Sequence, residues 1–336
     1  MKLAKIGYLA LGLWIVGKPI RVLSMVGNMR HLTPIHAPSL SAEVVRVCDL
    51  REAGVKRWRV NAADLGVPTY GTRAAPGADG AEWATRIAGV QLVLSEGQFV
   101  SRCSAARLLL FPLPWRLSGG APHAPVEVGA VRPRRPPERR GVTGHQVQPG
   151  VLRTTPTAPD WLPDPADVWG LLGAVLGVDD LIIVGDHLIS QVSRAPGPRC
   201  TPADLLDTVS RFTGAQKIGR LRQALQQVRA GVASPSETLT RLTIVRAGLP
   251  EPVTQCPVAT AERTYHADLG YPQWRIAIEY DGQYHFEGGD AQLNFDNERR
   301  EAMKDAGWVV LSLTSVDLRD PTKFLRRLRR AIARAR

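Results

Sequence analysis

One stretch of the sequence, IAIEYDGQYHF at 276–286, limits more than any other what this chain can fold into. It begins as a buried strand, because Ile278 and Tyr280 belong to an alternating apolar series. Successive side chains of a strand point to opposite faces, so Glu279 and Asp281 share the face opposite that series. Two carboxylates side by side on a core strand repel each other unless their charge is compensated. The stretch therefore predicts a site as well as a core.

The residues around this strand predict a regular series of elements. Ser234 at the N-cap, proline at the next position and Glu237 three residues after the cap are typical of a helix start, and Gly248 of its end. The elements that we expect are a helix at 234–247, strands at 253–259, 264–269 and 274–280, a helix at 292–306, a strand at 308–313 and a helix at 321–333. In the last helix an apolar stripe lies opposite a basic face that includes Arg326 and Arg330.

The position of Asp268 relative to Glu279 depends on the turn between their strands. A four-residue hairpin loop at 272–275 sets Asp268 directly across from Glu279. A two-residue loop at 272–273 would instead move Asp268 toward Arg275, which is a favourable ion pair. Solvated acids would also explain the spacing. The first register becomes favourable if Mg²⁺ binds there, since this ion takes oxygen ligands. A bound ion could also lower the pKa of an attacking water.

Three stretches carry a resemblance to a known family: SPSETLTRLTIVRAGLPEP from 234, HADLGYPQWRIAIEYDGQYH from 266 and DNERREAMKDAGWVVLSLTSVDLRDP from 296. With the α-β-β-β-α-β-α order, they resemble the very-short-patch-repair (Vsr)-like branch of the PD-(D/E)xK endonuclease superfamily over about 234–330. The resemblance implies a restriction-endonuclease-like fold, hydrolysis of DNA phosphodiester bonds, and Mg²⁺ or Mn²⁺ as cofactor.

The resemblance also implies roles for individual acids. Asp268 would be the principal metal ligand, and Glu279 and Asp281 would complete the acidic site. Glu237 matches an acid that often joins such sites, although the helix cap explains it equally well. The lysine that the superfamily carries two residues after the glutamate is replaced here by Asp281, as this branch allows.

Polar residues after the acids complete the predicted site. His285 would act near the scissile phosphate or as a proton donor or acceptor near pH 7, its alternative being a residue that only caps the strand end. Arg299 would face phosphate, or else form a surface ion pair along its helix. Arg299, Arg326 and Arg330 are the candidate nucleic-acid contacts.

The front of the chain is less regular. VSRCSAARLLLFPLP at 100–114 and much of 145–230 resemble type IV toxin–antitoxin antitoxins of the abortive-infection class, which implies DNA binding and a toxin partner. RPRRPPERR at 132–140 is typical of an exposed linker or loop. The domains that we expect are an uncertain extension at 1–40, a winged-helix-like or ordinary basic helical region at 41–130, a Pro/Arg-rich linker or loop at 131–144, a mainly helical region at 145–232 and the Vsr-like domain at 233–336.

Composition supports a polyanionic partner. The 336 residues carry a net charge of +12, although most of the basic residues are arginines, which a GC-rich gene also produces. Four widely spaced cysteines suggest neither zinc nor disulfides, which fits a cytoplasmic protein. The apolar run at 6–17 is too short to span a bilayer, so we expect no stable membrane association. This run is either a signal or anchor segment, or a non-native extension of a protein whose translation starts at Met25 or Met29.

The sequence thus predicts an α+β or α/β protein with a restriction-endonuclease-like carboxy-terminal core behind a mainly helical region. The expected function is a metal-dependent DNA endonuclease, with a role in defence or repair. The alternative is a non-catalytic DNA-binding regulator, or an antitoxin, whose core serves only for binding.

Overall fold

A computed structural model describes residues 44–118, 124–153, 161–282 and 289–335, with only the backbone described at 289–296. The fold is α+β, as expected. The apolar run at 6–17 and His285 lie outside the described residues. Within the described ranges, each helix is too short or too polar to cross a membrane.

The carboxy-terminal module has the predicted order of elements. Its elements are α10 (Pro235–Arg246), β6 (Val253–Ala259), β7 (Thr264–Tyr271), the 3₁₀ turn η1 (Pro272–Trp274), β8 (Ile276–Asp281), α11 (Gly289–Asp305), β9 (Val309–Thr314), α12 (Ser315–Arg319) and α13 (Thr322–Ala335). The series α-β-β-β-α-β-α is confirmed. The short helix α12 was not expected, although Thr314 and Asp317 form a capping box at its start.

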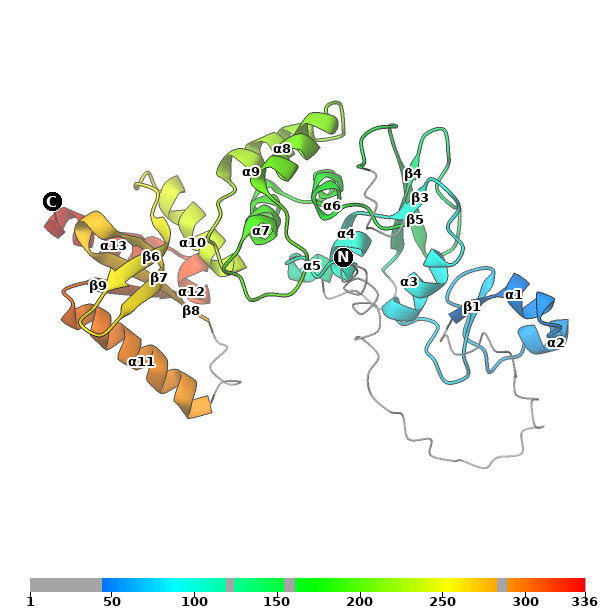
Figure 1. Ribbon diagram of the computed structural model, residues 1–336, viewed down its shortest axis with the longest axis horizontal. Helices are drawn as coiled ribbons and strands as arrows, with labels where there is room; N and C mark the ends of the chain where they lie inside the picture. The colour runs from blue at the N-terminus through cyan, green and yellow to red at the C-terminus, as the bar shows by residue number, and fades with distance from the viewer. Residues whose placement is uncertain (1–43, 119–123, 154–160, 283–288, 336) are drawn as a thin grey trace, which may run out of the picture. The chain divides into compact units, whose positions relative to one another are not determined.

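These strands form one sheet with helices on both faces. The order is β6-β7-β8-β9; the first three strands are antiparallel, and β9 runs parallel to β8. One face packs against α10 and α13 through Ile244, Phe324 and Leu328, and the other against α11 through Met303. Figure 1 shows α11, in orange, on the side of the sheet opposite α13. Because β8 and β9 are parallel, α11 is their crossover connection.

The hairpin between β7 and β8 has the four-residue loop. Tyr271 pairs with Ile276 and Leu269 with Ile278, so residues 272–275 form the turn. Arg275 lies in that turn with φ of 49° and is not opposite Asp268, so the two-residue loop is excluded.

The front of the chain contains short helices and strands, as predicted. They are β1 (Val44–Arg46), α1 (Val47–Glu52), α2 (Arg57–Val60), β2 (Thr72–Ala74), α3 (Trp83–Gln91), β3 (Gln98–Val100), α4 (Arg102–Leu108), α5 (Trp115–Ser118), β4 (Val126–Val131) and β5 (Val142–Val147). Strands β1 and β2 pair antiparallel, and a second sheet has the order β3-β4-β5.

The Pro/Arg-rich segment is a loop, one of the two alternatives that we expected, and it lies within one sheet and not between two domains. It connects β4 to β5, which pair in parallel from Val126↔Val142 to Val131↔Val147. Both ends of the segment are therefore bound to one sheet. Parallel neighbours require a crossover, and here a ten-residue loop without a helix, 132–141, provides it.

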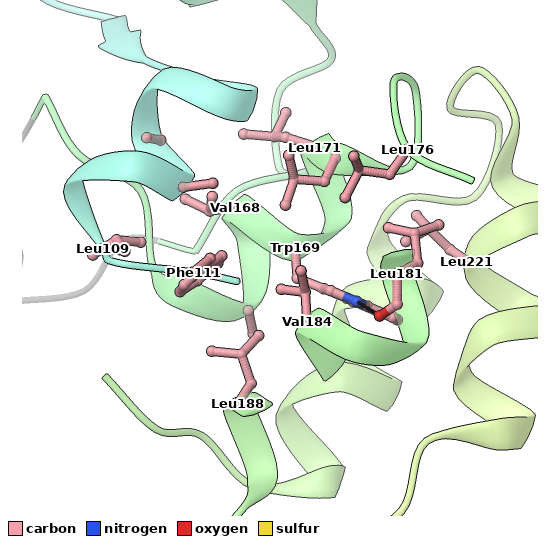
Figure 2. Close-up of a cluster of buried hydrophobic side chains, with 14 of the residues drawn as sticks. Leu109, Phe111, Val168, Trp169, Leu171, Leu176, Leu181, Val184, Leu188 and Leu221 are labelled. Carbon is pink, nitrogen blue, oxygen red and sulfur yellow. Dashed lines mark hydrogen bonds between the residues drawn. The ribbon is translucent and has the colours of Figure 1, made fainter. Parts of the chain in front are cut away.

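Four helices lie between 165 and 227, and they share one apolar core with α3, α4, β3 and β4 of the front of the chain. They are α6 (Pro165–Leu172), α7 (Val178–Ile189), α8 (Pro202–Arg211) and α9 (Ile218–Gln227). Figure 2 shows Trp169 at the centre of the apolar cluster, with its indole N–H donating to the carbonyl of Leu181 at 2.8 Å. Trp169 is fully buried, so this bond satisfies a polar group that water cannot reach.

A buried ion pair connects this helical region to α10. Arg241 donates to Asp186 of α7 at 3.1 Å, and the two side chains are 2% and 1% exposed. Thr238 and the backbone N–H of Arg229 donate to the same carboxylate, at 2.8 and 2.7 Å. The Asp186 carboxylate is thus satisfied only while α10 stays docked on α7.

We expect Arg241→Ala to lower the free energy of unfolding by about 3–5 kcal/mol, because it leaves the Asp186 charge buried without its partner. Arg246→Ala is the matched control: it removes an arginine of α10 paired with Asp179 of α7, but those side chains are 49% and 43% exposed. Such exposed pairs contribute about 0–1 kcal/mol. Urea denaturation measures both, and equal losses would contradict this interpretation.

Candidate functional site

The acids predicted from sequence gather where β7 and β8 separate. The ladder between these strands ends at Leu269↔Ile278, so the next positions, Asp268 and Glu279, face each other without backbone pairing. The Asp268 carboxylate instead accepts a hydrogen bond from the backbone N–H of Tyr280 at 2.8 Å. The register that brings Asp268 beside Glu279 is therefore present, and a side chain replaces the missing backbone acceptor.

A local distortion of β6 and β7 accompanies this arrangement. Ala267 packs in the core on the α11 side and Leu269 in the core on the α10 and α13 side, although residues two apart normally share a face. Gln255 is across from Asp268 in the β6 register and has φ of 46°, in the left-handed region. Strained backbone of this kind is enriched at functional sites.

Asp268 lies in a strongly desolvated position. Burial raises the pKa of its carboxyl above the ordinary value, and the Asp281 charge raises it further. The hydrogen bond from Tyr280 and the charge of Arg299 act in the opposite direction. Asp268 therefore interacts electrostatically with several charged groups of this site.

Glu279 and Asp281 are compensated by successive arginines of α11. Arg299 donates to Glu279, whose side chain is 2% exposed, and also to the carbonyl of His266 at 3.4 Å. Arg300 donates to Asp281, and both side chains are roughly one-quarter exposed. The ion pair of Arg299 is thus made with the sheet and not along its own helix, and its predicted contact with phosphate stays a prediction.

Glu237 joins the site from the start of α10. Its carboxylate accepts from the backbone N–H of Ala233 at 2.9 Å, from the Ser234 hydroxyl at 3.0 Å and from Gln255 at 3.5 Å. Burial raises the pKa of Glu237 to about 7, and the Asp268 charge adds to this effect. The helix cap and the electrostatic link to Asp268 are thus both present.

The carboxylates have the right chemistry for Mg²⁺ or Mn²⁺, but in the arrangement described arginines, and not a cation, lie against two of them. Within the described part of the chain, no three His, Cys, Asp or Glu side chains are grouped so that they could hold a metal. Guanidinium groups already contact Glu279 and Asp281. In this form of the protein, arginines supply the positive charge that we expected from a cation.

The remaining predicted residues lie apart from this cluster. Arg326 and Arg330 are exposed on the outer face of α13, opposite the buried stripe of Phe324 and Leu328, as expected. Sequence reasoning missed Arg300 and Gln255. The adjacent arginines 299–300 were a signal available in the sequence, whereas the position of Gln255 across from Asp268 depends on strand pairing that only the structure shows.

Comparison with known proteins adds relatives but no activity. No known family profile matches the chain, and no solved structure matches it. Two proteins of Mycobacterium tuberculosis, the uncharacterized protein MT2308 of strain CDC 1551 / Oshkosh and the uncharacterized protein Rv2248 of strain ATCC 25618 / H37Rv, are each 27% identical over 141 residues. These residues make up 41% of this chain, and the chain spans about half the length of the relatives, 51%.

We expect Glu237 to make the stability of the protein depend on pH. Its pKa is about 7 when folded against an ordinary value of 4.5, so between these values the folded chain holds a proton that the unfolded chain has lost. Stability is therefore greatest below about pH 4.5 for this group and falls as pH rises through 7. With about 1.4 kcal/mol per pKa unit, the loss is up to about 3 kcal/mol.

The measurement is the free energy of unfolding at pH 5 and pH 8. Glu237→Gln should reduce the difference between the two pH values relative to wild type, since glutamine does not titrate. Glu301→Gln, an exposed acid of α11 paired with Lys304, is the control and should leave the difference unchanged. If Glu237→Gln has the wild-type pH dependence, Glu237 is ionised throughout and the interpretation is wrong.

Proposed function

We propose that this protein acts on DNA and that its carboxy-terminal module is an endonuclease-like domain that hydrolyses phosphodiester bonds with Mg²⁺ or Mn²⁺. The observation that carries the proposal is the convergence of Asp268, Glu279 and Asp281 at the divergent end of β7 and β8. Acids held close together in buried or partly buried positions reduce stability, so their presence indicates a role other than folding. The order of elements agrees with the resemblance to Vsr-like endonucleases.

Different side chains of the module would have different roles in hydrolysis. Asp268 is held by the Tyr280 N–H, and Glu279 by Arg299, so their oxygens are fixed before any substrate binds. Glu237, with a pKa of about 7, can hold or release a proton close to neutral pH. A divalent cation would supply polarisation of the scissile phosphate. The exposed arginines of α13 would contact the DNA backbone.

The alternative is a DNA-binding regulator or antitoxin with an inactive core. The observation that favours it is the pairing of Glu279 and Asp281 with Arg299 and Arg300, which leaves the acids neutralised without a metal. In that case a partner toxin is the expected second component. The following experiments separate the two functions.

We expect Asp268→Asn to abolish metal-dependent cleavage while the protein still folds. Asparagine keeps a side-chain oxygen to accept from the Tyr280 N–H but removes the charge that a cation needs. Cleavage of plasmid DNA should fall to the background level, and the urea midpoint should stay near the wild-type value.

His285→Ala should slow cleavage less, by about 10²- to 10⁴-fold, as is usual for a general acid or base. DNA affinity should be unchanged in both variants. Wild-type protein that binds DNA but leaves plasmid, linear duplex and single strands intact with Mg²⁺ and Mn²⁺ would contradict the enzyme and favour the regulator.

We also expect Arg300 to compete with a cation for Asp281. Arg300→Ala should raise Mn²⁺ affinity by about five- to tenfold, since a partly exposed ion pair contributes about 1 kcal/mol. Calorimetric titration with Mn²⁺ measures this without any cleavage. Lys304→Ala is the matched control, because it removes one positive charge from the same helix, where Lys304 pairs with exposed Glu301.

If Lys304→Ala raises the affinity as much as Arg300→Ala does, the effect is one of general charge and not of competition at Asp281. If neither the wild-type protein nor the Arg300→Ala variant binds Mn²⁺, the acidic cluster is not a metal site and the regulator is the better proposal.

A further inference from the structure

The loop at 132–141 is arginine-rich and held in a defined conformation. The side-chain amide of Gln146 donates to the carbonyl of Arg134 at 2.6 Å, and that of Gln98 to the carbonyl of Arg135 at 2.8 Å. Gln98 is on β3 and Gln146 on β5, so both outer strands of the sheet hold the loop. Pro136 packs closely on Gly144: a Cβ atom added to Gly144 would lie only 2.5 Å from the side chain of Pro136.

Arginines in and around this loop fall into two groups. Arg86 is buried and donates to the carbonyl of Gly141 at 2.9 Å, and Arg139 donates to the carbonyl of Tyr70 at 2.5 Å. These two fasten the loop to the preceding part of the chain. A second group is exposed, and among the described residues its guanidinium groups make no hydrogen bond or ion pair: Arg132, Arg134, Arg135 and Arg140.

Unpaired arginines on a backbone that is held in place form a positively charged surface, to which a polyanion can bind. Five arginines within nine residues repel one another, and only Glu138 in the segment opposes their charge. The fold holds this segment rigidly although its positive charges are not neutralised within the described protein. An external anion with several charges, such as a phosphate backbone, would neutralise them.

An exposed aromatic residue contacts the loop through its backbone. Tyr70, whose carbonyl accepts from Arg139, is 84% exposed. Beside the loop, an open groove is lined by Arg135, Pro136, Pro137 and Glu138 of the loop and by His145 and other residues of β5. Burial lowers the pKa of His145 to about 4, so its ring is neutral. Flat, uncharged groups beside arginines are what unpaired nucleobases stack on, whereas bases inside a duplex are not accessible to them.

We propose that the loop at 132–141, together with Tyr70, is a second nucleic-acid-binding surface that takes an unpaired DNA strand. The arginines contact its phosphates, and Tyr70 stacks on a base. The choice of DNA rests on the proposed function, whereas the surface itself does not. Such a surface would hold the displaced or unpaired strand of a DNA substrate while the carboxy-terminal module acts elsewhere on it.

The test uses the full chain in EDTA, so that no cleavage can occur, with a fluorescent 15-nucleotide single strand followed by anisotropy over a range of salt. Replacing Arg132, Arg134, Arg135 and Arg140 by alanine should weaken binding by roughly 10- to 100-fold at low salt. It should also reduce the log–log salt slope, by about 0.7 for each phosphate that the protein no longer neutralises. The control replaces four other exposed arginines by alanine: Arg51, Arg57, Arg194 and Arg222.

Tyr70 tests the stacking interaction separately. Tyr70→Ala should weaken single-strand binding by roughly tenfold, Tyr70→Phe should keep it near wild type, and duplex binding should change little in both. An equal loss in the control arginine variant would overturn the proposal, as would an equal effect of Tyr70→Ala on duplex. Tighter binding of an RNA of the same sequence, abolished in the loop variant, would assign the surface to RNA instead of DNA.

These outcomes are independent of catalysis. A protein that cleaves no DNA but loses single-strand binding in the loop variant would contradict the endonuclease and support this surface. A protein that cleaves DNA with unchanged single-strand affinity in the loop variant would do the reverse.

Discussion

Compensation of buried negative charge is the constraint on which the carboxy-terminal module depends. Glu279 and Asp281 are on the face of β8 that α11 covers, because α11 is the crossover to the parallel strand β9. An acid under a helix must receive a partner from that helix or lose its charge. The adjacent arginines 299 and 300 supply it. Topology and charge are therefore linked: the crossover that completes the sheet also carries the counter-ions of the site.

The arginine excess of the chain has two structural uses. Inside the protein, arginines neutralise acids that no water reaches well, as in the pairs Arg241–Asp186 and Arg211–Asp167, the latter at 2.5 Å. On the loop at 132–141 the exposed arginines remain unpaired among the described residues and face solvent. The net charge of +12 therefore does not show that some arginines are neutralised inside the protein while others are exposed and unpaired on one loop. Only the second kind is available to an anionic partner.

Sequence reasoning succeeded where structure depends on local signals. The cap at Ser234, the glycine after α10 and the alternating strands predicted the element order of the last hundred residues, because caps and side-chain periodicity act within a few positions. It was incomplete at the Pro/Arg-rich segment, where a loop was one of the two expected alternatives but the strands that it connects were not predicted to pair. Composition indicated exposure correctly, but it could not show that both ends of the segment enter the same sheet, since strand pairing is a long-range property.

The sequence by itself determined that Asp268, Glu279 and Asp281 belong to neighbouring strands, because strand alternation and a proline-initiated turn leave few registers. Tertiary structure alone decided what neutralises them. Arg299 and Arg300 are about twenty positions from their partners, and the length and packing of the crossover helix bring them there. The same holds for the loop at 132–141, whose arginines are plain in the sequence but become a surface only because Gln98 and Gln146 hold its backbone from two strands. Charges attract over distances that the fold sets, and local sequence does not encode those distances.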